Sequence, residues 1–293
     1  MTPRDMALAA LVAVIWGLAF VFIKFGLDSF SAPQLTALRF IIACLPILVL
    51  PRPAVPWLLL IVIGLTLFTG QFLLLFFAYV QGMPPGLASV VQQMQAFFTV
   101  LLATLFLRDA PSWRQAIGMA VAFGGLGLIG LTIGGELTFL ALALTLGGAF
   151  SWAIGNVLVK RGGDVPMLPF MAWLSLVPPL PALLVSSLHD PGSSLLSALA
   201  GASWLSLAAA LYLGAVATTF AYAIWGKLLA RYPTAMVAPF ALLAPCTGVI
   251  SSALVFGERF GGLRYAGMAL IFAGLAIIVL PVGRRPFFGP AGK

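Results

Sequence analysis

Residues 84–129 read PPGLASVVQQMQAFFTVLLATLFLRDAPSWRQAIGMAVAFGGLGLI, and residues 233–278 read PTAMVAPFALLAPCTGVISSALVFGERFGGLRYAGMALIFAGLAII. The two stretches align without a gap. The matched pairs include Pro84 with Pro233, Asp109 with Glu258, Gly118 with Gly267 and Phe123 with Phe272. Each stretch holds two apolar runs that are separated by a short charged turn. An internal duplication of this kind is typical of repeat architectures, and it predicts that the chain is built from two similar halves.

The duplication extends toward the N-terminal end of each half. Trp16 and Lys24 match Trp152 and Lys160, with a spacing of eight residues in both pairs. We therefore expect a first repeat at residues 1–135 and a second at 136–283, followed by a cytoplasmic tail at 284–293.

The composition identifies the solvent around this chain. Of its 293 residues, 62% are apolar and 8% are charged, whereas about a quarter of the residues of an average soluble domain are charged. So few charged groups cannot cover the surface of a soluble protein of this size. The composition predicts an integral membrane protein.

The apolar runs predict an all-α protein of ten membrane spans. About 20 apolar residues are needed for a helix to cross the hydrocarbon layer, and prolines, glycines and charges mark the connections. The predicted spans are 6–27, 34–50, 57–80, 86–107, 114–133, 137–159, 167–187, 204–226, 235–256 and 263–280. Each repeat holds five spans. Because five is odd, the two repeats must have inverted orientations, as in many secondary transporters.

The basic residues predict the orientation in the membrane. With both termini in the cytoplasm, eleven basic residues lie at inner ends and three at outer ends, which agrees with the positive-inside rule. The inner set is Arg4, Arg52, Arg108, Arg114, Lys160, Arg161, Lys227, Arg231, Arg284, Arg285 and Lys293; the outer set is Lys24, Arg259 and Arg264. The net charge of +8 is thus explained by topology, and we expect no nucleic-acid partner.

Several motifs resemble a known family. They are Trp16-Gly17-x-x-Phe20 with Lys24, Leu38-Arg39-Phe40, and a carboxylate after spans four and nine followed by a glycine-rich span. They resemble the EamA-type repeat of the drug/metabolite transporter superfamily, and within it the bacterial YddG-type amino-acid exporters. The resemblance implies ten helices, alternating access, a location in the bacterial inner membrane, and a central cavity built by spans 1, 3, 4, 6, 8 and 9. Arg108-Asp109 departs from the family's Gly-Glu pattern, which Gly257-Glu258 keeps.

Polar groups inside a span are costly, so each is a candidate for a site. Gln92, Gln95 and Thr99 share one face of span four, since they stand at i, i+3 and i+7. They line either a water-filled cavity or a hydrogen-bonded seam between helices.

Aromatic residues supply a second set of candidates. Trp16 and Trp152 are repeat partners on the first span of each half, with Phe20 and Asn156 one turn further along. Repeat symmetry would bring the two indoles to opposite walls of one cavity, where they would stack on a substrate. Packing in the protein core is the alternative. Trp57, Trp113, Trp204 and Trp225 stand at span ends and are expected to be interface anchors.

Spans three and eight add Gln71, Tyr79, Thr218 and Tyr222, as cavity or seam residues. Together these side chains predict a neutral, aromatic and amide-rich pocket. Such a pocket suits a zwitterion or an amphipathic small molecule better than a phosphate.

Four further residues are candidates for structural or gating roles. Lys24 is expected to reach the membrane interface. Arg39 lies inside span two and needs a partner, for which Asp28 is the nearest acidic residue on the outer side. Pro239 and Pro245 interrupt span nine, whereas span four has no proline. Helices interrupted by proline are candidate hinges.

These observations predict a secondary transporter and exclude several chemistries. The sequence has no GxxxxGK[ST] loop and no HExxH motif, and its single histidine, His189, is expected in an outer loop. We therefore expect no enzyme and no cofactor. The expected activity is export of small metabolites, amino acids above all, by alternating access in uniport or exchange, because no Asp or Glu lies within the hydrocarbon part of a span. A channel-like pore, a membrane scaffold and an exporter of drugs or other amphipathic metabolites remain alternatives.

Overall fold

The computed structural model describes residues 1–107, 111–134, 137–160, 165–189 and 192–280. Arg108, Asp109 and the predicted tail at 284–293 lie outside this part of the chain, which is helical and contains no strand. The elements are α1 (Pro3–Leu27), α2 (Ala32–Cys44), η1 (Leu45–Leu48), α3 (Trp57–Ile63), η2 (Gly64–Gly70), α4 (Gln71–Val80), α5 (Pro85–Val91), α6 (Met94–Leu107), α7 (Trp113–Gly130), α8 (Phe139–Val159), α9 (Met167–Leu174), α10 (Pro179–His189), α11 (Leu195–Gly201), α12 (Trp204–Leu211), η4 (Tyr212–Phe220), α13 (Ala221–Arg231), α14 (Thr234–Val237), η5 (Ala238–Leu242), α15 (Leu243–Phe256) and α16 (Gly262–Val279).

Every predicted span coincides with helical structure, to within a few residues at its ends. Within the described residues, eight helices are long and apolar enough to cross a membrane, and Ala32–Leu48 is a shorter apolar helix. Polar caps mark the starts of several helices. Ser31 and Ser112, for example, form capping boxes with Gln34 and Gln115, which satisfy backbone N–H groups that the helix leaves free.

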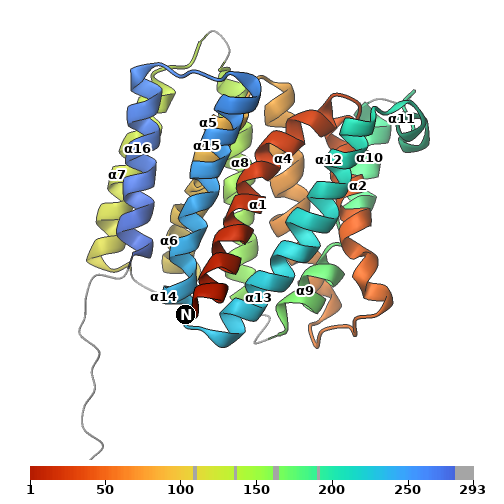
Figure 1. Ribbon diagram of the computed structural model, residues 1–293, viewed down its shortest axis with the longest axis horizontal. Helices are drawn as coiled ribbons and strands as arrows, with labels where there is room; N and C mark the ends of the chain where they lie inside the picture. The colour runs from red at the N-terminus through yellow and green to blue at the C-terminus, as the bar shows by residue number, and fades with distance from the viewer. Residues whose placement is uncertain (108–110, 135–136, 161–164, 190–191, 281–293) are drawn as a thin grey trace, which may run out of the picture.

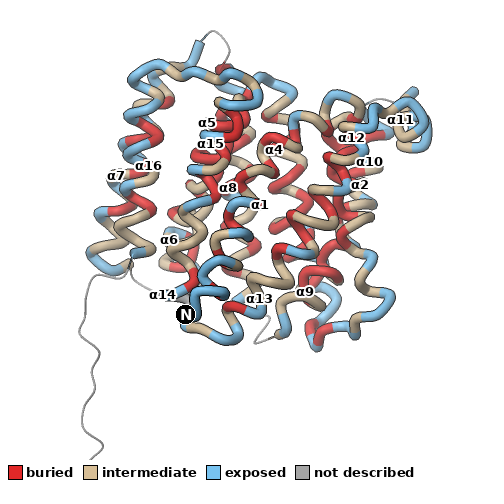
Figure 2. Tube along the Cα trace, in the orientation of Figure 1, coloured by how far each residue is buried: buried red, intermediate tan, exposed pale blue. Residues whose placement is uncertain are grey.

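The helices run side by side in one bundle, with α7 and α16 paired at its edge (Figure 1). Glycines let these two helices approach closely. A Cβ atom at Gly125 would lie 2.5 Å from the carbonyl oxygen of Gly267, and one at Gly118 would lie 2.7 Å from that of Gly274. Buried residues concentrate in the central helices, while much of α7 and α16 is exposed or half-buried (Figure 2).

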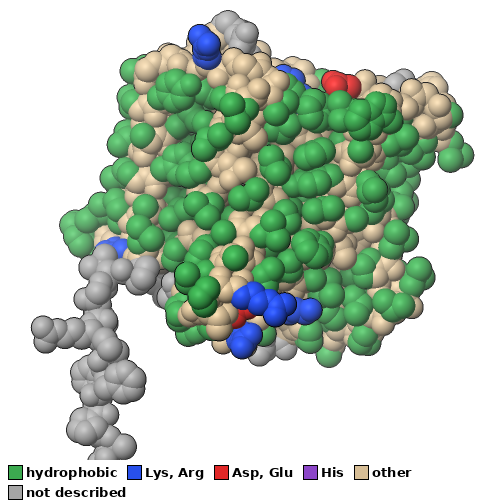
Figure 3. Space-filling view, viewed as in Figure 1, with side chains coloured by type: hydrophobic (Ala, Val, Ile, Leu, Met, Phe, Trp, Pro, Cys, Tyr) green, Lys and Arg blue, Asp and Glu red, His purple; other side chains and the backbone are tan. Residues whose placement is uncertain are grey.

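The outer surface is suited to lipid. Figure 3 shows apolar side chains over the middle of the face in view, with Lys and Arg side chains toward the two ends. Among the exposed side chains are Leu105, Leu180, Leu211 and Leu254. Such a surface is unfavourable in water but neutral in hydrocarbon.

Spans four and nine are both interrupted in their first halves. In span nine the interruption is η5, which contains Pro239, as its prolines predict. In span four the helix breaks at Gln92–Gln93, between α5 and α6, although no proline stands there. Proline positions therefore did not predict this second break. Gln92–Gln93 corresponds to Ala241–Leu242 in the repeat alignment, so both halves break their helix at equivalent positions.

Spans three and eight share a second irregularity that the sequence did not predict. Each contains a π-helical segment, η2 and η4. The hydroxyl of Thr69 donates to the carbonyl oxygen of Gly64 (3.3 Å), and that of Thr218 donates to the carbonyl oxygen of Leu213 (2.8 Å). Both residues of the second pair stand 149 positions after those of the first, which is the offset of the repeat alignment. Short π-helical segments are frequently found at functional sites.

Candidate substrate cavity

A cavity of about 350 Å³ lies between the two repeats. Its described lining residues come from predicted spans 1, 2, 3, 4, 6, 7, 8 and 9, and none comes from α7 or α16. They are Trp16, Ala19, Phe20, Ile23, Arg39, Leu67, Gln71, Phe72, Leu75, Gln92, Gln93, Gln95, Trp152, Asn156, Val159, Met167, Met171, Ala217, Tyr222, Trp225, Ala241 and Ala244. Pockets that bind small molecules have volumes of about 300–1,000 Å³ and the same mainly apolar lining with a few polar groups.

An aromatic cluster forms one wall. The ring of Trp16 lies 5.6 Å from that of Tyr222 and 5.1 Å from that of Trp225, between centroids. The indole N–H of Trp16 donates to the carbonyl oxygen of Ala217 (3.0 Å), which fixes the ring in this position. Trp225 was expected to be an interface anchor, but it lines the cavity instead. The expectation failed because the predicted span ended at residue 226, whereas the helix continues to Arg231.

Two amide side chains at the cavity have buried polar atoms that no described residue bonds. Gln71 and Gln92 are 1% and 3% exposed. Within the described chain, both polar atoms of the Gln92 side chain and Oε1 of Gln71 have no partner. Buried polar groups are nearly always paired, because an unpaired group costs about 1–3 kcal/mol. Both residues line the cavity, and their buried atoms would gain a partner if the side chains turned toward a molecule inside it.

The other amides of the cavity form a seam between α6 and α8. The Asn156 side-chain amide donates to Gln95 Oε1 (3.2 Å) and to Thr99 Oγ1 (3.3 Å), and Asn156 Oδ1 accepts from the indole N–H of Trp152 (3.1 Å). Gln95, Asn156 and Trp152 also line the cavity, but Thr99 does not. The stripe on span four thus divides: Gln92 faces the cavity, Thr99 belongs to the seam, and Gln95 contributes to both.

Tyr79 and Thr218 are absent from the described lining of the cavity. The hydroxyl of Tyr79 donates to the carbonyl oxygen of Phe20 (3.1 Å), which joins α4 to α1. Thr218 is 2% exposed and accepts from Arg39 Nε (3.2 Å). Both were expected as cavity or seam residues, and the structure places them in contacts between helices.

Arg39 does not pair with Asp28, so that expectation was wrong. Asp28 is exposed, whereas Arg39 is 4% exposed and lines the cavity. Its guanidinium carbon lies 3.9 Å from the centroid of the Phe72 ring. The sequence predicted a neutral pocket, but the pocket contains a cation. Within the described residues no ion pair involves Arg39, and the ion pair that is present joins Arg231 to Asp5.

The remaining structural candidates lie away from the described lining of the cavity. Lys24 is exposed, and its Nζ lies 4.4 Å from the centroid of the Phe256 ring, near the end of α1. Pro239 stands in η5, and Pro245 is buried in the first turn of α15.

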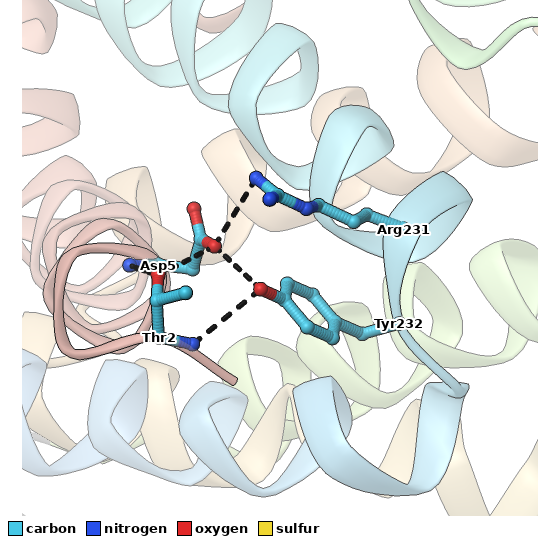
Figure 4. Close-up of polar contacts among 4 residues, drawn as sticks. All are labelled: Thr2, Asp5, Arg231 and Tyr232. Atoms are coloured by element: carbon cyan, nitrogen blue, oxygen red, sulfur yellow. Dashed lines mark hydrogen bonds and ion pairs between the residues drawn. The ribbon is translucent and has the colours of Figure 1, made fainter.

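A polar cluster holds the start of α1 against the end of α13 (Figure 4). Asp5 Oδ2 accepts from the hydroxyls of Tyr232 (2.6 Å) and Thr2 (2.7 Å) and lies 3.4 Å from Nη1 of Arg231. An apolar cluster around Ala9, Leu228 and Val237 packs beside it. These contacts join the two repeats at the end of the molecule where the chain begins.

The bundle of apolar helices and its central cavity define a membrane transporter, and the comparisons with known proteins agree. Residues 5–131 and 139–280 each match the EamA-like transporter family. The chain belongs to this family and is a multi-pass membrane protein. The expectation that it is not an enzyme is confirmed by this membership.

Named relatives span almost the whole chain. A probable amino-acid metabolite efflux pump of Escherichia coli strain K12 is 40% identical over 95% of this chain and 96% of its own length. Its Salmonella typhimurium counterpart is 41% identical over the same shares. A probable terminal-alkyne amino-acid exporter of Streptantibioticus cattleyicolor is 27% identical over 92% of this chain and 91% of its own. A solved crystal structure superposes with a TM-score of 0.64 at 18% identity, covering 94% of this chain and 96% of the other, which shows a shared fold.

Proposed function

We propose that this protein exports amino acids or amino-acid metabolites across the bacterial inner membrane through the cavity between its repeats. The observation that carries the proposal is the pairing of an aromatic wall, Trp16, Tyr222 and Trp225, with the unpartnered amides of Gln71 and Gln92. An amino acid presents both an apolar side chain and polar groups that such a cavity would satisfy. The names of the relatives favour the same substrate class.

The proposed architecture has ten spans in two inverted five-helix repeats, 1–135 and 136–283, with both termini and the tail at 284–293 in the cytoplasm. The repeat alignment, the family matches at 5–131 and 139–280, and the distribution of basic residues support it. Alternating access then exposes the cavity to one side at a time. We propose uniport or exchange as the mode of transport, since the described lining residues include Arg39 but no carboxylate that could carry a coupling proton.

Counterflow in proteoliposomes tests this function. Vesicles loaded with one unlabelled amino acid at a time should take up the same labelled amino acid for at least part of a panel, and an imposed proton or sodium gradient should drive no uphill accumulation. Gln92→Ala should lower the exchange rate about tenfold, which corresponds to the loss of one hydrogen bond to a charged group. Gln115→Ala, at the start of α7 and away from the cavity, is the control. Absence of exchange across the panel would contradict the substrate class, and gradient-driven accumulation would contradict uniport.

A further inference from the structure

Arg39 is a buried cation to which the described residues supply no counter-ion. It is 4% exposed, and within the described part of the chain the single ion pair lies elsewhere, between Arg231 and Asp5. Burying an unpaired charge is strongly unfavourable, so buried cations are normally paired with an anion or with several acceptors. The unusual environment of Arg39 therefore needs an explanation.

The contacts of Arg39 leave one edge of its guanidinium group open. Nε donates to Thr218 Oγ1 at 3.2 Å, and that hydroxyl in turn donates to the carbonyl oxygen of Leu213. One face is covered by Phe72, whose ring centroid lies 3.9 Å from the guanidinium carbon. Among the described residues, no hydrogen bond reaches either terminal nitrogen. Because the residue lines the cavity, these two nitrogens are the donors available to a ligand there.

The acceptors of the same cavity complement this cation. Oε1 of Gln71 and Oε1 of Gln92 are buried without a donor, and both residues line the same space as Arg39. The cavity therefore combines donors that match a carboxylate with neutral oxygen acceptors that match an ammonium group. The paired N–H groups of a guanidinium bind both oxygens of a carboxylate at once. A phenyl ring stacked on the guanidinium, as Phe72 is on Arg39, holds these N–H groups in a fixed orientation.

We propose that Arg39 binds the carboxylate of the transported molecule, with Gln71 and Gln92 accepting from its ammonium group. This inference rests on the proposed function and specifies its substrate class: the ligand supplies the anion that the described residues around Arg39 do not. Thr218 and Phe72 are then positioning residues, because they hold the guanidinium in place through its Nε and its face.

Substrate analogues test the inference on the unaltered protein first. L-Phenylalanine should compete in counterflow at least tenfold more strongly than L-phenylalaninamide, since a hydrogen bond to a charged group changes affinity by about tenfold to a hundredfold. Equal competition by the acid and the amide would overturn the proposal without any variant.

Variants then assign the discrimination to Arg39. In Arg39→Gln the preference for the acid over the amide should disappear, and Arg39→Lys should retain part of it, because it keeps the charge but loses the forked donors. Arg264→Gln is a matched control. Arg264 also donates from Nε to a threonine, Thr132 Oγ1 at 3.0 Å, but it lies outside the described lining of the cavity, so this variant should keep the full preference. A folded Arg39→Gln variant that still prefers the acid would overturn the proposal.

A binding measurement separates this inference from the proposed function. Binding of 3-phenylpropionate and of its carboxamide can be followed through the fluorescence of the tryptophans beside the cavity. If no amino acid is exchanged, the proposed function fails, yet Arg39-dependent preference for 3-phenylpropionate would still support the carboxylate site. If the variants at Arg39 do not fold, equal binding of the two compounds by the unaltered protein overturns the site, and tenfold preference for the acid supports it.

Discussion

Two seams that the internal repeat makes equivalent are built from different chemistry. In the first, α1 meets α15 through Gly17, Ala244 and Gly248. In the second, α8 meets α6 at the corresponding positions, Ala153, Gln95 and Thr99. The first seam is a close approach of backbones. The second is bridged by Asn156, which takes the place of Phe20 and bonds both Gln95 and Thr99.

The comparison shows that symmetry is kept in the backbone and lost in the side chains. Both halves break the same helix and carry the same π-helical segment, so the scaffold of the cavity is two-fold. Among the described residues, the unpaired amides of the cavity occur in the first half only, because Gln71 and Gln92 correspond to Phe220 and Ala241. A small asymmetric ligand such as an amino acid needs a cavity whose two walls differ.

The largest expected effect follows from adding one methyl group to the apolar seam. In Gly17→Ala the new Cβ atom would overlap the carbonyl oxygen of Ala244 and lie 2.5 Å from Cβ of Thr247. Overpacking against a backbone that cannot move costs about 3 kcal/mol. We expect that loss in the apparent free energy of unfolding in mixed micelles. Gly127→Ala is the matched control, since a Cβ atom there meets nothing within 4 Å, and an equal loss in both variants would contradict the role of the seam.

A smaller effect is expected at the polar seam. Asn156→Ala removes two hydrogen bonds to α6, at Gln95 and Thr99, and one to Trp152 in its own helix. Bonds between membrane helices contribute only about 0.6 kcal/mol each on average. We expect the apparent free energy of unfolding in mixed micelles to fall by about 1.5 kcal/mol. The control is Gln93→Ala, whose amide bonds the carbonyl oxygen of Ser89 within its own span. A loss at Asn156 as large as that at Gly17 would show that the polar seam is as rigid as the apolar one.

Much of the fold could be predicted from the sequence, because a membrane requires long apolar helices and their ends are marked by charges, prolines and glycines. The prolines of span nine also predicted its break, which lies at Pro239. The break at Gln92–Gln93 and the π-helical segments were missed, since neither contains a residue type that forbids a regular helix. Irregular backbone of this kind is tolerated in a membrane only where it is buried in protein or lines a cavity, so that its free backbone groups find partners. Those partners are set by the tertiary structure and cannot be identified from the local sequence.

The candidate site was predicted only in part, because its contacts also depend on tertiary structure. Periodicity showed that Gln92, Gln95 and Thr99 share a face, but what lies opposite that face depends on the packing of α8. The acidic residue nearest to Arg39 in the sequence proved irrelevant, because the partner of Arg39 is a threonine 179 positions away. Partners from distant spans cannot be identified from spacing alone.

The central claim is that the substrate occupies the cavity between the repeats, and substrate protection of a single cysteine tests it most directly. Ala241→Cys places a thiol in the cavity lining, in a chain whose Cys44 and Cys246 are replaced by alanine. L-Phenylalanine should slow its reaction with a methanethiosulfonate reagent severalfold, while leaving Ser197→Cys, exposed on α11, unaffected. A rate at Ala241→Cys that is the same with saturating substrate as without it, in a variant that still exchanges phenylalanine, would contradict the claim.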